Sequence, residues 1–157
     1  MSRLPVIPLA AEPVLGPEAL RSLRALVGLM IPPSAEYQVP GADDDRIFAD
    51  IVATLRAHAA LARDAIARLD DLAGGSFADR DAAGREAAAL DFRTAAKSLA
   101  ALLVSVTVQC YYRDDRVMVS LGMEPRPPFP KGFEVEQGDW SLLDPVRARP
   151  KMYRPAP

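Results

Sequence analysis

The sequence predicts an all-α protein, a helical bundle built on one long antiparallel helix hairpin and followed by an extended C-terminal tail rich in proline and aromatic residues. All fifteen prolines lie at or before Pro40 or at or after Pro125, so the middle of the chain lacks the strongest helix breaker. That middle carries apolar residues three or four positions apart, the period of one helix face. We expect a helical domain over residues 1–122, with an irregular N-terminal arm, and a tail over 123–157 that belongs to the same domain.

The first helix is expected to begin at Gly16 and Pro17 and to end before Pro32. Proline is favoured in the first turn of a helix, and the residue before a proline avoids the helical region. One apolar stripe runs along this segment, made of Leu20, Leu23, Val27 and Met30. The segment therefore predicts a helix of about four turns.

The second helix is expected to begin at the acidic run 43–45 and to continue unbroken to Gly74 and Gly75. Aspartate favours both the capping position and the first turn of a helix. The stripe that follows keeps one face for seven turns and consists of Ile47, Ile51, Leu55, His58 or Ala59, Ala62, Ile66 and Leu69. Glycine then marks the helix end.

The third helix is expected to begin at Asp79 or Asp81 and to run to Cys110, with side chains of increasingly buried character along Ala87, Leu90, Thr94, Leu99, Leu102, Leu103, Val106 and Cys110. The β-branched stretch 104–108 would also suit a strand, but its alanine- and leucine-rich surroundings favour helix. Because a short glycine turn joins the second and third helices, we predict an antiparallel hairpin. A further short helix is expected from Asp114 to Leu121, closed by Gly122.

The tail from Met123 onward is dense in proline, which favours extended backbone. A disordered linker would normally lack the large apolar residues that this tail carries, namely Phe129, Phe133, Trp140, Leu142, Leu143, Val146, Met152 and Tyr153. We therefore expect the tail to be docked, either on its own helices or on a partner.

The composition excludes some classes of function. The formal net charge is -2, which does not favour nucleic-acid binding. The longest uncharged apolar run, residues 98–112, falls short of the roughly 20 residues of a membrane-spanning helix, so no membrane span is expected. The N-terminus shows neither a secretory signal nor a twin-arginine pair. We expect a cytoplasmic protein, periplasmic only if it is exported together with a partner.

No catalytic constellation is visible in the sequence. His58 is the only histidine and Cys110 the only cysteine, and we interpret them as a hydrogen-bonded histidine at the edge of the core and a small buried hydrophobe. The sequence has no Gly-rich phosphate loop, no nucleophile elbow and no metal-ligand spacing. We expect no catalytic, cofactor-binding or metal-binding residue, and therefore no enzyme activity by this chain alone.

The segment from Tyr111 to Arg116 allows two interpretations. It is either a solvated turn whose charges pair with one another while the tyrosines pack inward, or a contact surface, because tyrosine and arginine are enriched at interface hot spots. Together with the prolines and aromatic residues of the tail, it supplies the candidate partner-binding residues: Tyr111, Tyr112, Arg113, Arg116, Pro127, Pro128, Phe129, Pro130, Phe133 and Trp140.

Two stretches resemble a known family. Residues 23–32 followed by 40–42 and an acidic helix start resemble the opening of the small subunit of gluconate 2-dehydrogenase, the subunit 3 family. Tyr111 and Tyr112 with Gly122 shortly after are similar to the family's tyrosine-containing stretch. The resemblance implies a small helical subunit without a cofactor of its own. Its partner would be a large flavoprotein dehydrogenase of the glucose-methanol-choline class that holds FAD, often with a cytochrome subunit as electron acceptor.

The sequence thus leads to one function and one alternative. The first is a non-catalytic accessory subunit that binds and stabilises or matures a flavin-dependent dehydrogenase. The alternative is an autonomous helical bundle that binds a small apolar ligand or another protein. Self-association stays open in both cases.

Overall fold

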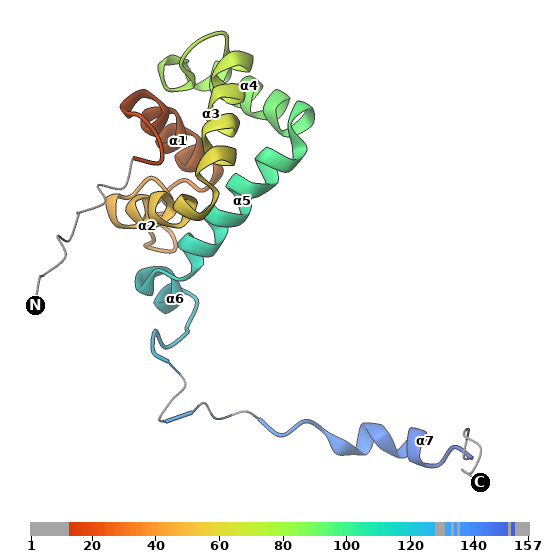
Figure 1. The fold of residues 1–157 in the computed structure, drawn as a ribbon. Coiled ribbons are helices and arrows are strands. Elements are labelled where there is room, and N and C mark those ends of the chain that lie inside the picture. Colours follow the sequence, from red (N-terminus) through yellow and green to blue (C-terminus); the bar gives the residue numbers. More distant parts are fainter. Residues whose placement is uncertain (1–12, 128–130, 133, 135, 151, 153–157) are drawn as a thin grey trace, which may run out of the picture. The chain divides into compact units, whose positions relative to one another are not determined.

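The computed structural model describes residues 13–127, 131–132, 134, 136–150 and 152. Helices dominate this part of the chain, and it contains no strand, only an isolated β-bridge between Ser34 and Val39. The all-α fold class predicted from the sequence is confirmed. The chain divides into two compact units, Met1–Pro125 and Arg126–Pro157, which are described separately (Figure 1).

Residues 13–125 of the first unit contain six α-helices: α1 (Pro17–Met30), α2 (Asp45–Leu55), α3 (Ala59–Ala73), α4 (Ala82–Ala95), α5 (Lys97–Tyr112) and α6 (Asp115–Ser120). Two short 3-10 turns, Arg56–His58 and Phe77–Asp79, lie between them. The predicted first helix is confirmed, because α1 begins at Pro17 and the residue after Met30 is already extended ahead of Pro32.

The predicted second helix is interrupted. A 3-10 turn at Arg56–His58 separates α2 from α3, and His58 leaves the helical region with φ -128° and ψ 30°. Most protein helices are stabilised by the packing of an apolar face. All three residues of this turn are exposed, so no large apolar side chain packs the turn against the core. The expectation that His58 lies at the edge of the core is wrong for the same reason.

The predicted third helix is also interrupted. It is bent by 115° between α4 and α5 (Figure 1), where Ala96 adopts φ -130°. The hydroxyl of Thr94 donates to the carbonyl of Leu90 at 2.9 Å, a contact that weakens and bends helices. The bend also allows both halves to contact α3. The hairpin of two long helices is therefore replaced by four shorter ones.

Helix ends follow the local chemistry that the sequence indicates. Asp44 accepts from the amides at the start of α2, and Asp81, rather than Asp79, caps α4. The left-handed backbone of Gly74 (φ 68°) ends α3, and Gly122 (φ 74°) follows α6. Glycine adopts this conformation at no steric cost.

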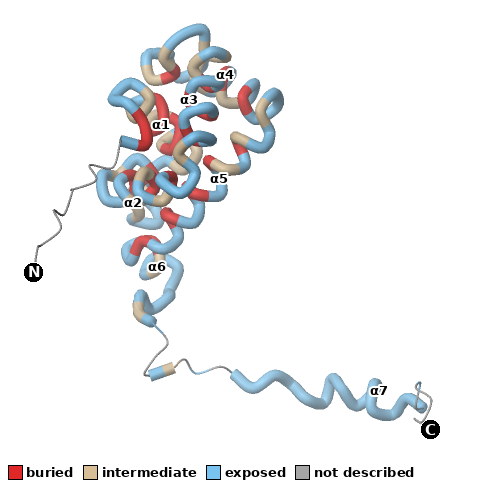
Figure 2. Tube along the Cα trace, in the orientation of Figure 1, coloured by how far each residue is buried: buried red, intermediate tan, exposed pale blue. Residues whose placement is uncertain are grey.

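The core of the first unit lies between α1, α2, α3, α4 and α5 (Figure 2). Its largest fully buried side chains include Leu23, Leu26, Ile66, Leu69, Phe77, Phe92 and Leu103. Asp70 at the end of α3 accepts from the Ser22 hydroxyl at 2.7 Å and from the Phe77 amide at 2.8 Å. These two bonds tie α1 and the following 3-10 turn to α3.

The second unit contains a 3-10 turn, Trp140–Leu143, and a single helical turn, α7 (Asp144–Arg147). Every residue of 136–150 is exposed (Figure 2). The tail is thus not uniformly extended. Four of the candidate residues, Pro128, Phe129, Pro130 and Phe133, lie outside the described residues, as does Tyr153.

None of the described helices is by itself long and apolar enough to cross a membrane. The helices α4 and α5 meet the length and composition test only as a pair, across their 115° bend.

Candidate functional site

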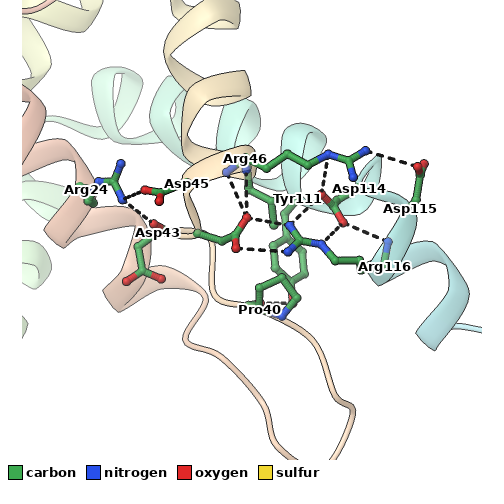
Figure 3. Close-up of polar contacts among 11 residues, drawn as sticks. Arg24, Pro40, Asp43, Asp45, Arg46, Tyr111, Asp114, Asp115 and Arg116 are labelled. Atoms are coloured by element: carbon green, nitrogen blue, oxygen red, sulfur yellow. Dashed lines mark hydrogen bonds and ion pairs between the residues drawn. The ribbon is translucent and has the colours of Figure 1, made fainter.

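The segment Tyr111–Arg116 lies where α5 ends and α6 begins. Arg113 contacts Asp50 on α2, and Arg116 contacts the capping residue Asp44 at the start of α2. Figure 3 shows the surroundings of Arg116. Two guanidinium nitrogens of Arg113, Nε and Nη2, donate to the carboxylate of Asp50. Nη2 also donates to the Thr54 hydroxyl at 2.9 Å. Paired donors on one carboxylate make a charge-assisted, geometrically specific contact. Arg113 therefore connects the end of α5 to the outer face of α2.

Arg116 forms a second and larger network. Its Nη2 donates to Asp44 at 2.6 Å and to Asp114 at 3.1 Å, and its Nε donates to Asp114 at 2.9 Å. The Asp114 side chain is only 3% exposed and also accepts from the backbone amide of Arg116 at 3.0 Å. Arg46 adds an ion pair to Asp114 at 3.6 Å. One arginine thus joins the capping carboxylates of α2 and α6.

This network changes the acidity of its carboxyl groups. Hydrogen bonds from Arg116 are the main reason why the pKa of Asp44 and the pKa of Asp114 lie below their usual range, against the opposing effect of burial. The same bonds raise the pKa of Arg116. Each group is therefore stabilised in its charged form, which suits a structural ion pair rather than proton transfer near neutral pH.

The two tyrosines lie in different environments. Tyr111 is buried, its hydroxyl donates to the carbonyl of Pro40 at 3.2 Å, and burial raises its pKa. Tyr112 is half exposed and meets the Tyr111 ring edge to face, with centroids 5.3 Å apart. Of the four candidates in this segment, only Tyr112 has no side-chain hydrogen bond or ion pair to a described residue.

A polar cleft of about 350 Å³ lies beside these contacts, lined by Arg46, Ile47, Asp50, Cys110, Arg113 and Asp114. Cys110 is buried as expected, and burial is the main cause that raises the pKa of its thiol. A protonated thiol is a poor nucleophile. Within the described ranges, no three histidine, cysteine, aspartate or glutamate side chains gather as metal ligands.

An apolar groove of about 440 Å³ lies between α1, α4 and α5, and no pattern in the sequence indicates it. Its rim is made of Leu29, Leu90, Val104 and Val108, all of which are exposed. Leu90 was expected to face the core, and this expectation is wrong because α4 buries Ala88 and Phe92 instead and leaves Leu90 exposed. Glu86 and Arg93 lie at the mouth of the groove.

The remaining candidate residues belong to the tail. Pro127 and Trp140 are exposed, and the indole Nε1 of Trp140 donates to Gln137 at 3.4 Å. Four more large apolar side chains of the second unit are exposed as well: Leu142, Leu143, Val146 and Met152. None of them packs against a core within the part of this unit that the structure describes.

The chain matches no family model, no curated protein and no solved structure in the comparisons made. The resemblance to the gluconate 2-dehydrogenase small subunit therefore stays a proposal.

Proposed function

We propose that this chain is a non-catalytic accessory subunit whose C-terminal unit binds a partner protein. The observation that carries the proposal is the exposure of every large apolar side chain in the described part of that unit, Trp140, Leu142, Leu143, Val146 and Met152. Soluble proteins rarely leave such a cluster in water unless it becomes buried in a complex. Tryptophan is moreover among the residues that contribute most to binding energy.

The spacing of these residues indicates how the segment binds. Trp140, Leu143 and Val146 are three positions apart, within a 3-10 turn that continues into a helical turn. Residues at such intervals lie near one another on one side of a short helix, the arrangement by which helical segments enter a groove on a partner. Asp139 starts the turn by accepting from the Ser141 amide at 3.0 Å.

The polar residues of the first unit support a structural role. Arg113 is engaged with Asp50 on α2 and Arg116 with its capping residue Asp44, and the thiol of Cys110 is buried. The first unit would thus serve as a rigid carrier for binding surfaces. For the partner we propose a large flavin-dependent dehydrogenase of the glucose-methanol-choline class that holds FAD. This choice rests on the resemblance of residues 23–32, 40–42 and 111–112 to the gluconate dehydrogenase small subunit.

Gentle purification of the tagged chain from its native host, at natural expression level, tests this proposal. We expect a stoichiometric large partner and flavin absorption near 450 nm, roughly where oxidised flavins absorb. The triple variant Trp140→Ser, Leu143→Ser, Val146→Ser should lose the partner. A control triple in the same unit, Glu136→Ser, Ser141→Ala and Arg149→Ser, changes only exposed polar side chains and should retain it.

Two results would contradict the proposal. A colourless chain that elutes without a partner would contradict the proposal that it is a subunit of a flavoprotein complex. Equal retention of the partner by both triple variants would show that the C-terminal apolar cluster is not the binding surface.

A further inference from the structure

The apolar groove of the first unit is an open surface rather than an enclosed pocket. Its floor contains the buried residues Leu26, Phe92 and Ala100. Its rim side chains, Leu29, Leu90, Val104 and Val108, are between 37% and 54% exposed. Small-molecule sites usually bury most of their ligand in a concave cavity. Four large apolar residues around an open groove are more typical of a protein–protein interface.

Helix α4 carries a charge pattern across this groove. Glu86, Leu90 and Arg93 all line it, and Leu90 lies four residues after Glu86 and three before Arg93. These intervals place the three side chains on one helix face, with the two charges about 10 Å apart along the axis. Neither charge has an ion-pair partner within the described ranges of the chain. The most exposed rim residue, Leu90, stands between them.

This pattern is complementary to itself. When two copies of α4 pack antiparallel about a twofold axis near Leu90, Glu86 of each copy faces Arg93 of the other. A twofold interface requires such reciprocity, in which residue i meets j of the partner and j meets i. The groove beside Leu90 provides the space that the leucine of the second copy needs. One surface therefore supplies the protruding side chain, the hollow that receives it and both charged pairs.

We propose that α4 and the adjoining groove form a homodimer interface, with a second copy of this chain as the occupant. The face is distinct from the C-terminal apolar cluster, so the dimer goes beyond the proposed accessory function. A partner helix could carry any charge pattern, and a small apolar ligand would leave the rim exposed. Neither of these occupants accounts for opposite charges placed symmetrically about an exposed leucine.

Charge reversal on the full-length chain tests the dimer. Sedimentation velocity over a range of concentrations should show a monomer–dimer equilibrium for the natural chain. Glu86→Lys and Arg93→Glu should each weaken dimerisation by about tenfold, since each replaces two symmetric attractions by two repulsions. The double variant should dimerise again. An equimolar mixture of the two single variants should form a heterodimer, because one copy then presents two positive charges and the other two negative ones.

Control variants and folding checks make each outcome decisive. Asp64→Lys and Arg63→Glu reverse exposed charges on α3, outside the groove lining, and should leave dimerisation unchanged. Circular dichroism should show equal helicity for all variants.

Three outcomes would overturn the proposal. One is a natural chain that is monomeric at every concentration, whether or not it carries a bound apolar molecule. Another is a dimer that responds to the groove variants no more than to the controls. The third is a dimer abolished by the Trp140, Leu143, Val146 triple variant, which would place self-association in the C-terminal unit. Loss of the flavoprotein partner alone would bear on the proposed function and not on the dimer.

Discussion

The guanidinium Nη2 of Arg116 lies 2.6 Å from the carboxylate of Asp44, although 72 positions separate the two residues. Asp44 caps α2, and Arg116 stands in the first turn of α6, next to that helix's own capping residue Asp114. A single arginine therefore connects the beginnings of two helices and offsets the charge of two capping carboxylates (Figure 3).

Removal of this arginine should destabilise the first unit. Arg116→Met keeps the length of the side chain but removes its charge, which leaves the 3%-exposed carboxylate of Asp114 with the backbone amide of residue 116 and the longer contact to Arg46. A nearly buried charge that loses its main partner is costly, so we expect the free energy of unfolding to fall by roughly 2 kcal/mol. Urea unfolding followed by circular dichroism measures this. Glu18→Gln removes an exposed pair with Arg21 and should change the midpoint little. Equal midpoints for both variants would contradict the prediction.

The same network predicts a dependence of stability on pH. Asp44 and Asp114 have pKa values lowered in the folded chain, first of all by hydrogen bonds from Arg116. A carboxyl group of this kind stabilises the fold above its ordinary pKa of about 3.9, and the stabilisation is lost as the pH falls toward the folded-state pKa. The free energy of unfolding should therefore decrease from about pH 5 to pH 3. In Arg116→Met this slope should be shallower, and parallel curves for the two proteins would refute the assignment.

Thr107 is a site where a substitution should increase stability. The residue is 1% exposed, and its hydroxyl oxygen is buried without a hydrogen bond to any described residue. Thr107→Val keeps the shape and removes the unsatisfied group, so we expect the free energy of unfolding to rise by about 1 kcal/mol. Thr94→Val is the matched control, because the Thr94 hydroxyl is exposed and bonded to Leu90, and it should give no such gain. A loss of stability in Thr107→Val would mean that the hydroxyl has a partner.

Cys110 should react slowly in the folded chain. Its side chain is 1% exposed, and burial raises the pKa of its thiol, so little thiolate is present and little of it is accessible. We expect an aromatic disulfide reagent at about pH 8 to label the native protein at least ~100-fold more slowly than the protein in denaturant. Similar rates in both states would place the sulfur at the surface.

The helix ends were predictable from the sequence because their causes are local. Pro17 at the start of α1, Asp44 at the start of α2 and Gly74 at the end of α3 act through their own backbone preferences or through bonds to adjacent amides. The interruptions at Arg56–His58 and at Ala96 contain neither proline nor glycine. They depend on which helical turns pack against the core, and hydrophobic periodicity alone does not predict this packing.

The candidate site shows the same division. Tyr111–Arg116 stands out by composition, yet the partners of its arginines, Asp44 and Asp50, lie 72 and 63 positions away. Nothing local indicates that these charges meet. Leu90 has the spacing of a core residue, yet α4 buries Ala88 and Phe92 and leaves Leu90 on the rim of the groove. Residue types could thus be predicted from the sequence, whereas their pairing required the tertiary structure.

The turn at Arg56–His58 also affects how the protein acquires its secondary structure. It divides this part of the chain into α2 with 11 residues and α3 with 15, and isolated helices shorter than about 12–15 residues are marginal in water. A synthetic peptide covering residues 45–73 should therefore be largely coil, even though its apolar stripe matches a single long helix. In this chain helicity depends on the assembled core. Helix formation and core assembly should consequently occur in one cooperative transition.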